Sequence, residues 1–219
     1  EWWGNYLSVS DWADLWIHEG FAVYMEALYI EEKYGIDEYN KFFRKKIIKK
    51  IPLTQSIVPH RNATIENVSG LDPYNKGAYV LHMLRYLIGD DKFFEILSEF
   101  LYSKKQLPNN QVTTKDFIDL VHLKIENKID WFFKSYLYEK DYPVLIQNTK
   151  HGSNHTFIEL YWENKNFSMP VEVYYNSNTG LRHRKLSLTN KPTMIAIPQH
   201  NKIKIDPNKR ILLTVKNKS

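Results

Sequence analysis

Residues 10–35 read SDWADLWIHEGFAVYMEALYIEEKYG, and this stretch decides the fold of the first part of the chain. Ser10 can cap the start of a helix, and Gly35 can end it, because glycine readily adopts the left-handed conformation that often closes a helix. Between them, apolar residues recur at steps of three, four and seven, as they do along one face of an α-helix. We therefore expect one long helix over residues 11–34.

Two carboxylates interrupt the apolar stripe of this predicted helix. A rotation of about 100° per residue places Glu19 and Glu26 on the same side as Leu15 and Val23. An ionised carboxylate in an apolar environment is costly unless a cation, a metal ion or a strong donor meets it. The spacing alone leaves two interpretations open: the carboxylates pair with Lys or Arg beside the stripe, or they face a positive group in a functional site.

Gly20 follows the first of these carboxylates. A glycine inside a helix is about 1 kcal/mol less favourable than alanine, and it usually marks a place where another group comes close. Such an approach fits a functional site, and Gly20 is a candidate for the lining of a substrate pocket there.

The helical period continues to about residue 140. Helices are predicted over residues 38–51, 74–88, 91–104, 114–127 and 130–140. Pro52 stops the first of these and Gly89 ends the second, while Thr113 and Asp116 have the spacing of a capping box. Residues 52–73 show no sustained period, and loops of this length inside compact domains tend to be functional.

After Pro143 the period shortens from about 3.6 toward 2, which indicates strands. Strands are predicted over residues 157–162, 171–175, 184–188, 194–197, 203–205 and 211–215. Short strands separated by turn residues are typical of a small antiparallel β-sandwich. The sequence thus predicts an α+β chain with a helical domain over residues 1–142 and a β-sandwich domain over residues 143–219.

Composition excludes several classes of function. The net charge is +5. The densest basic run, Arg44 to Lys50, includes Ile47 and Ile48 on a predicted amphipathic helix, which indicates a solvated face. We therefore expect no nucleic-acid partner. The chain has no cysteine, so a metal ion would need His, Asp or Glu ligands. No apolar run reaches the roughly 18 residues of a transmembrane segment.

The opening residues resemble the zinc region of the aminopeptidase N family. The resemblance is carried by Glu1-Trp-Trp-Gly-Asn5, Asp11-Trp12, Leu15-Trp16, Glu19-Gly-Phe-Ala22 and Tyr24-Met-Glu26. In that family an HExxH helix supplies two histidine ligands and a glutamate base, and a second glutamate ligand follows about eighteen residues later. The resemblance implies that Glu19 is this zinc ligand. It also implies that the histidines belong to a part of the parent chain upstream of Glu1.

The same resemblance assigns roles to residues around Glu19. Tyr74, within Asp72-Pro-Tyr-Asn-Lys-Gly77, corresponds to the tyrosine that stabilises the oxyanion, although a single Tyr among 15 would otherwise be expected to be a packing residue. Glu26 is expected to hold the N–H of a zinc-bound imidazole. His18 stands where the family usually has Asn, and we interpret it as a neighbour of the substrate pocket or a packed imidazole.

The resemblance implies the helical lobe of a thermolysin-like peptidase domain followed by a β-sandwich. The parent enzyme would use Zn²⁺ to remove N-terminal residues from peptides, and the missing N-terminal part of the chain would be a partner of this one. Because a catalytic zinc site needs three protein ligands, we expect this chain alone to bind zinc weakly and to be inactive. Two alternatives remain: a non-catalytic module that binds protein or glycan, and a related zinc enzyme with another hydrolase activity.

Overall fold

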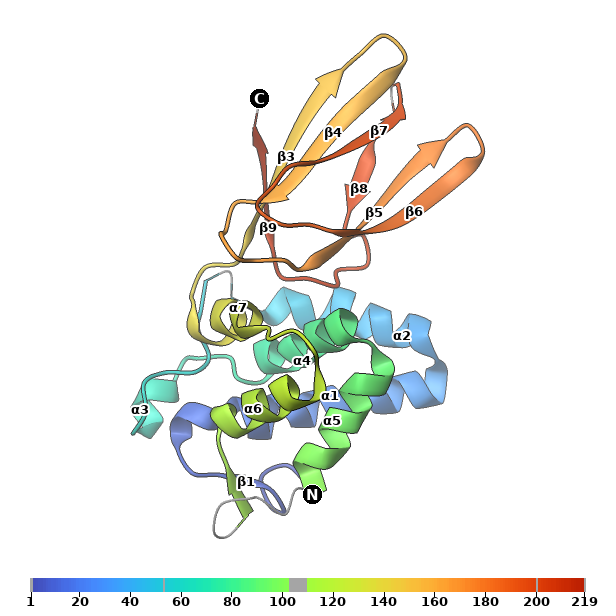
Figure 1. The fold of residues 1–219 in the computed structure, drawn as a ribbon. Helices are drawn as coiled ribbons and strands as arrows, with labels where there is room; N and C mark the ends of the chain where they lie inside the picture. The colour runs from blue at the N-terminus through green and yellow to red at the C-terminus, as the bar shows by residue number, and fades with distance from the viewer. Residues whose placement is uncertain (1, 53, 103–109, 200, 219) are drawn as a thin grey trace. The chain divides into compact units, whose positions relative to one another are not determined.

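The computed structural model describes residues 2–52, 54–102, 110–199 and 201–218. The chain forms two compact units, Glu1–Asp141 and Tyr142–Ser219. Helices dominate the first unit, and the second consists of β-strands (Figure 1). The mixed α+β class predicted from the sequence is therefore confirmed.

The helical unit contains seven α-helices among the described residues. They are α1 (Trp16–Tyr34), α2 (Ile36–Lys41), α3 (Ile65–Val68), α4 (Asn75–Ile88), α5 (Asp90–Tyr102), α6 (Thr114–Lys124) and α7 (Asp130–Phe133). A π-helical segment extends α2 over Phe42–Ile47, and another extends α7 over Lys134–Tyr138. Strands β1 (Ser8–Val9) and β2 (Gln111–Val112) form a short parallel pair. Residues 103 and 104 of the predicted helix 91–104 lie outside the described residues.

None of the described helices combines the length and the apolar character needed to cross a membrane.

The predicted helix 11–34 starts later than expected. A 3₁₀ turn over Trp12–Asp14 precedes α1. Asp11 rather than Ser10 caps this turn, because the Asp11 carboxylate accepts a hydrogen bond from the N–H of Ala13. The same carboxylate accepts the N–H groups of Asn62 and Ala63 and so fixes a distant loop at this point. Gly35 ends α1 with a φ of +87°, as predicted.

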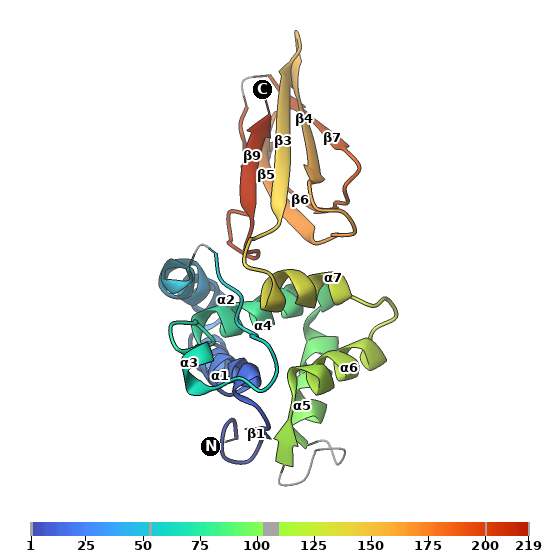
Figure 2. The same cartoon turned by 90° about the vertical axis from the view of Figure 1, so that its left-hand side faces the viewer.

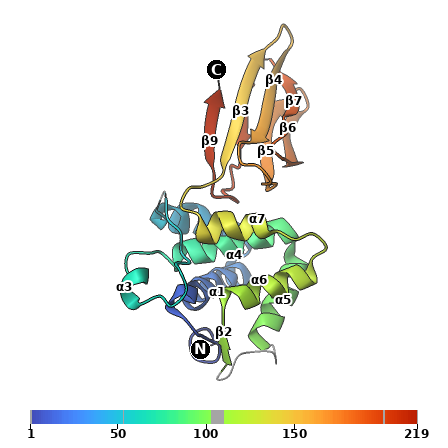
Figure 3. The same ribbon diagram turned by 60° about the vertical axis from the view of Figure 1, so that its left-hand side comes forward.

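Helix α1 packs against α4 inside the helical unit, and the two lie side by side in Figures 2 and 3. The buried face of α1 consists of Trp16, Ile17, Gly20, Phe21, Tyr24 and Ala27. The predicted stripe with Leu15, Glu19 and Val23 is only half-buried. The large aromatic side chains bury more apolar surface than this stripe would, which explains why the helix turns them inward.

A tryptophan joins the first helix to the later part of the helical unit. The indole N–H of Trp16 donates to the hydroxyl oxygen of Thr114 at 2.8 Å, and the ring packs edge-on against Phe117. Thr114 is the first residue of α6, whose start is capped by Thr113 and Asp116 in the predicted capping box. The aromatic core and the start of α6 therefore hold the N-terminal end of α1.

The second unit consists of two sheets. Its strands are β3 (Val144–His151), β4 (His155–Trp162), β5 (Pro170–Ser177), β6 (Gly180–Ser187), β7 (Thr193–Pro198), β8 (Ile203–Ile205) and β9 (Thr214–Lys218). One sheet has the order β7-β4-β3-β9 and the other β6-β5-β8. All neighbours are antiparallel except β3 and β9, which run parallel. Strand β3 was not predicted, because its apolar start gives way to the polar run Gln147 to His151 and shows no alternation.

Candidate active site

Helices α1 and α4 cross at two glycines. A Cβ atom added to Gly20 would lie 2.7 Å from the Cα of Gly77, and one added to Gly77 would lie 2.9 Å from the Cα of Gly20. Both distances are shorter than real Cβ contacts, so the two backbones touch without intervening side chains. The close approach predicted for Gly20 is therefore made by the backbone of α4, and the crossing fixes the positions of residues next to the two glycines.

Glu19 and Tyr74 meet beside this crossing. Glu19 precedes Gly20 on α1, and Tyr74 immediately precedes α4, three residues before Gly77. The Tyr74 hydroxyl lies close enough to the Glu19 carboxylate to interact with it. Partial burial, and then this interaction with Glu19, raise the pKa of Tyr74. The phenol is therefore a protonated hydrogen-bond donor at neutral pH, and 46% of the residue is exposed.

A network of hydrogen bonds fixes the loop that carries Tyr74. One oxygen of the Asp72 carboxylate accepts the backbone N–H of Asn75 at 2.8 Å. The side chain of Gln55 accepts the N–H of Asp72 and donates to the carbonyl oxygen of Gly70, both at 2.7 Å. Sequence reasoning missed Gln55, because it lies in a stretch without periodicity and its partners are distant in sequence.

A cleft of about 570 Å³ opens beside Glu19. It is lined by Trp2, Trp3, Gly4, Asn5, His18, Glu19, Ala22 and Met25. His18 also lines a smaller cleft of about 320 Å³ next to Trp12 and Leu15. Burial lowers the pKa of His18, and the charge of Glu19 opposes this shift. His18 thus lies between two clefts, and its buried Nε2 atom has no hydrogen-bond partner among the described residues.

Glu26 lies about two turns along α1 from Glu19, which corresponds to a rise of roughly 10 Å. Its side chain is exposed and pairs with Lys46 at 2.9 Å. The structure therefore brings Glu19, His18, Gly20 and Tyr74 together but places Glu26 apart from them. The role expected for Glu26 depends on a zinc-bound imidazole and stays a prediction.

Glu19 is the metal ligand that the sequence predicts at this site. No group of three His, Asp or Glu side chains within the described part of the chain is arranged to hold a metal ion. The half-buried Glu19 carboxylate beside a cleft suits one ligand position, and a catalytic zinc ion requires three protein ligands.

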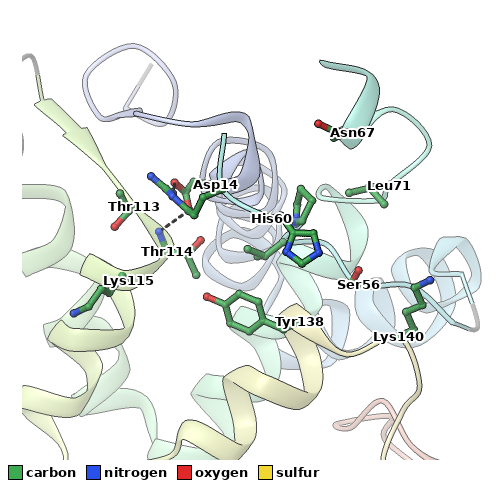
Figure 4. Close-up of a pocket in the computed structure, with 13 residues that line it drawn as sticks. Asp14, Ser56, His60, Asn67, Leu71, Thr113, Thr114, Lys115, Tyr138 and Lys140 are labelled. Carbon is green, nitrogen blue, oxygen red and sulfur yellow. Dashed lines mark hydrogen bonds and ion pairs between the residues drawn. The ribbon is translucent and has the colours of Figure 1, made fainter. Parts of the chain in front are cut away.

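A second pocket, of about 910 Å³, lies in the same helical unit (Figure 4). At its base the Asp14 carboxylate accepts the N–H of Thr114 at 2.9 Å and pairs with Arg61 at 2.5 Å. The hydroxyl of Tyr138 points into this pocket (Figure 4), and burial, followed by the charge of Asp14, raises its pKa. Leu71, shortly before Tyr74, lines the opposite wall. This pocket was not predicted from the sequence, because its walls come from four separate segments.

Comparisons with known proteins agree on one family. The model of the peptidase family M1 domain matches residues 1–136. Human endoplasmic reticulum aminopeptidase 2 is 32% identical over 108 residues, which cover 46% of this chain and 11% of that protein. Aminopeptidase N from Rattus norvegicus is 25% identical over 174 residues, which cover 69% of this chain and 17% of that protein.

A solved structure shares the fold. The crystal structure of Legionella pneumophila aminopeptidase A in complex with aspartic acid matches 100% of this chain and 26% of that one, with a TM-score of 0.73 and 16% identity. The chain thus spans between about a tenth and about a quarter of the length of these relatives. Since the family model covers well over half of the 219 residues, the chain belongs to peptidase family M1.

Proposed function

We propose that the protein containing this chain is a zinc-dependent aminopeptidase that removes N-terminal residues from peptides. In this proposal Glu19 is a metal ligand and Tyr74 stabilises the oxyanion. The observation that carries the proposal is the juxtaposition of the Tyr74 hydroxyl and the Glu19 carboxylate at the crossing of α1 and α4. These are the two residues that the resemblance to the aminopeptidase N family assigns to the reaction.

The chain's own residues would act through position and protonation. Zinc, when bound, would polarise the substrate carbonyl and lower the pKa of a bound water. Glu19 would supply a carboxylate ligand from the first turn of α1. Tyr74 would donate its hydroxyl proton in a hydrogen bond to the oxyanion, since a phenol is protonated at neutral pH.

In this proposal the rest of the protein supplies the other groups that the reaction needs. The two histidine ligands, the general base and the residues that recognise the substrate amine have no assigned counterpart in this chain. With Glu19 as its single assigned ligand, the chain by itself would hold zinc weakly and would not cleave peptides. His18 and Gly20 would border the substrate pocket, and Glu26 would orient a ligand histidine.

The test uses the full-length protein that contains this chain. Glu19→Gln removes the ligand charge with little change in shape, and Glu32→Gln changes an exposed glutamate of the same helix as a control. We expect the first variant to lose zinc, measured by atomic absorption after dialysis, and the second to retain it. If Glu19→Gln kept its zinc, the ligand assignment would be wrong.

The substrates that the full-length protein hydrolyses distinguish an aminopeptidase from another hydrolase and from a non-catalytic module. An aminopeptidase hydrolyses aminoacyl substrates and peptides with a free N-terminal amine but not their N-acetylated forms. Cleavage of the acetylated peptides would indicate another hydrolase of this architecture. Absence of any cleavage by a zinc-loaded protein would favour a non-catalytic binding module.

A further inference from the structure

Lys76 is a buried cation that the proposed reaction does not use. It is the second residue of α4, and its relative exposure is 0%. Lysine is almost never fully buried unless its charge is met by a partner, and a positive charge is unfavourable near the N-terminus of a helix. Burial lowers the pKa of Lys76 to about 8, and the charge of Asp72 opposes this shift. A lysine kept at such a position calls for an explanation.

The partners of Lys76 lead to the loop that carries Tyr74. The ammonium group donates to the backbone carbonyl oxygen of Gln55. The side chain of Gln55 in turn holds Gly70 and Asp72, each by a hydrogen bond of 2.7 Å. Gln55 therefore connects the lysine to the residues that immediately precede Tyr74.

Asp72 provides a second connection. One of its oxygens accepts the backbone N–H of Asn75 at 2.8 Å and the side-chain amide of Asn75 at 3.1 Å. Its other oxygen is buried and has no hydrogen-bond partner among the described residues. The Lys76 ammonium interacts electrostatically with this carboxylate. Without the ammonium, the half-buried Asp72 carboxylate would lose a positive charge beside Tyr74, which would favour a rearrangement of the loop.

We propose that Lys76 is a positioning residue for Tyr74. Through Gln55 and Asp72 it fixes residues 70–73 and so keeps the Tyr74 hydroxyl directed at Glu19. Residues two apart on a helix point to different sides, so Lys76 acts through the loop and not by contact with a substrate. This inference rests on the proposed role of Tyr74 and adds a residue to which that proposal gives no task.

The experiment is a double-mutant cycle in the full-length zinc-loaded protein. Lys76→Met is made in the wild type and in Tyr74→Phe, with the exposed Lys92→Met as a control. A misplacement of about 1 Å costs on the order of 100-fold in rate, so we expect Lys76→Met to lower kcat by about 10- to 100-fold, with KM and zinc content unchanged. In the Tyr74→Phe background the same change should lower kcat by less than about 2-fold, because the hydroxyl to be positioned is gone.

Two results would overturn the proposal. If Lys76→Met lowered kcat equally in both backgrounds, the lysine would act on the structure in general and not through Tyr74. If it left kcat of the wild type unchanged, it would have no positioning role. By contrast, an unchanged kcat in Tyr74→Phe alone would refute the assigned role of the tyrosine and with it the proposed function.

A second variant keeps the test decisive if Lys76→Met does not fold. Gln55→Glu preserves the size of the side chain and its acceptor for the Asp72 N–H but removes the donor to Gly70. We expect it to lower kcat at unchanged KM and zinc content, again only while Tyr74 is present. Full activity of Gln55→Glu would show that the loop does not depend on this connection.

Discussion

Gly20 and Gly77 lie in direct backbone contact where α1 crosses α4, and neither position has room for a methyl group. The contact places Glu19 and Tyr74 next to each other although they come from different segments of the chain. The geometry of the candidate active site thus depends on two residues that carry no chemistry themselves.

Gly20→Ala should destabilise the protein although alanine favours helices. The new methyl group would lie 2.7 Å from the Cα and 2.8 Å from the carbonyl carbon of Gly77, so the helices would have to separate. Overpacking of this kind typically costs about 1–3 kcal/mol, which outweighs the gain of about 1 kcal/mol in helix propensity. Urea unfolding measures the difference. Ala22→Gly on the exposed side of α1 serves as the control and should cost only the propensity. A more stable Gly20→Ala variant would contradict the tight crossing.

From the proposed role of Tyr74, Tyr74→Phe should lower kcat of the full-length protein by about 10²- to 10³-fold, the usual effect of removing one donor to an oxyanion. Zinc content should not change, because the phenol is not an assigned ligand. Steady-state kinetics and metal analysis of the same preparation check both parts. Tyr29→Phe, which alters an exposed tyrosine of α1, should behave like the wild type.

Thr113→Ala should lower the free energy of unfolding by about 1 kcal/mol, the typical value of a helix N-cap. The hydroxyl oxygen of Thr113 accepts the N–H of Asp116 at 3.2 Å, and the Asp116 carboxylate accepts the N–H of Thr113 at 2.8 Å. Asp116→Asn retains an oxygen acceptor and should therefore cost less. Equal stability of Thr113→Ala and wild type in thermal or urea unfolding would argue against a contribution from this cap.

Lys76 should give the protein a pH-dependent stability. Its pKa is about 8 in the folded protein and 10.5 ordinarily, with Asp72 as the charged group that opposes the shift. Between these values the unfolded chain binds more protons at this position than the folded one. The free energy of unfolding should therefore rise as the pH increases from 8 to 10, by at most about 1.4 kcal/mol per pH unit. Urea unfolding at pH 7, 8, 9 and 10 measures the slope. The difference from Lys76→Met isolates this group, and identical slopes would show that the lysine is not perturbed.

Local sequence signals predicted much of the helical unit. Gly35 and Gly89 end helices where expected, each with a positive φ, and the capping box at Thr113 is present. These features are encoded within a few neighbouring residues. Strand β3 escaped prediction because it has no alternating pattern, and β9 begins at Thr214, later than expected, because the apolar Ile211 and Leu212 are buried outside a strand.

The candidate site was only partly accessible from the sequence. The resemblance to the aminopeptidase N family singled out Glu19 and Tyr74, which the structure places in contact. The helical wheel was wrong about which face of α1 is buried, because a periodic pattern does not rank the aromatic side chains that dominate the core. Gln55 and the role of Lys76 could not be predicted, since both depend on contacts across a loop without periodicity.

Thr114 connects segments that are far apart along the chain. It accepts a hydrogen bond from Trp16 across 98 residues and donates one to Asp14 across 100. Closing so long a loop carries an entropic cost before any contact offsets it, and long-range contacts slow folding. We therefore expect the start of α1, and with it the orientation of Glu19, to reach its final form late in folding, after synthesis of the chain has passed α6.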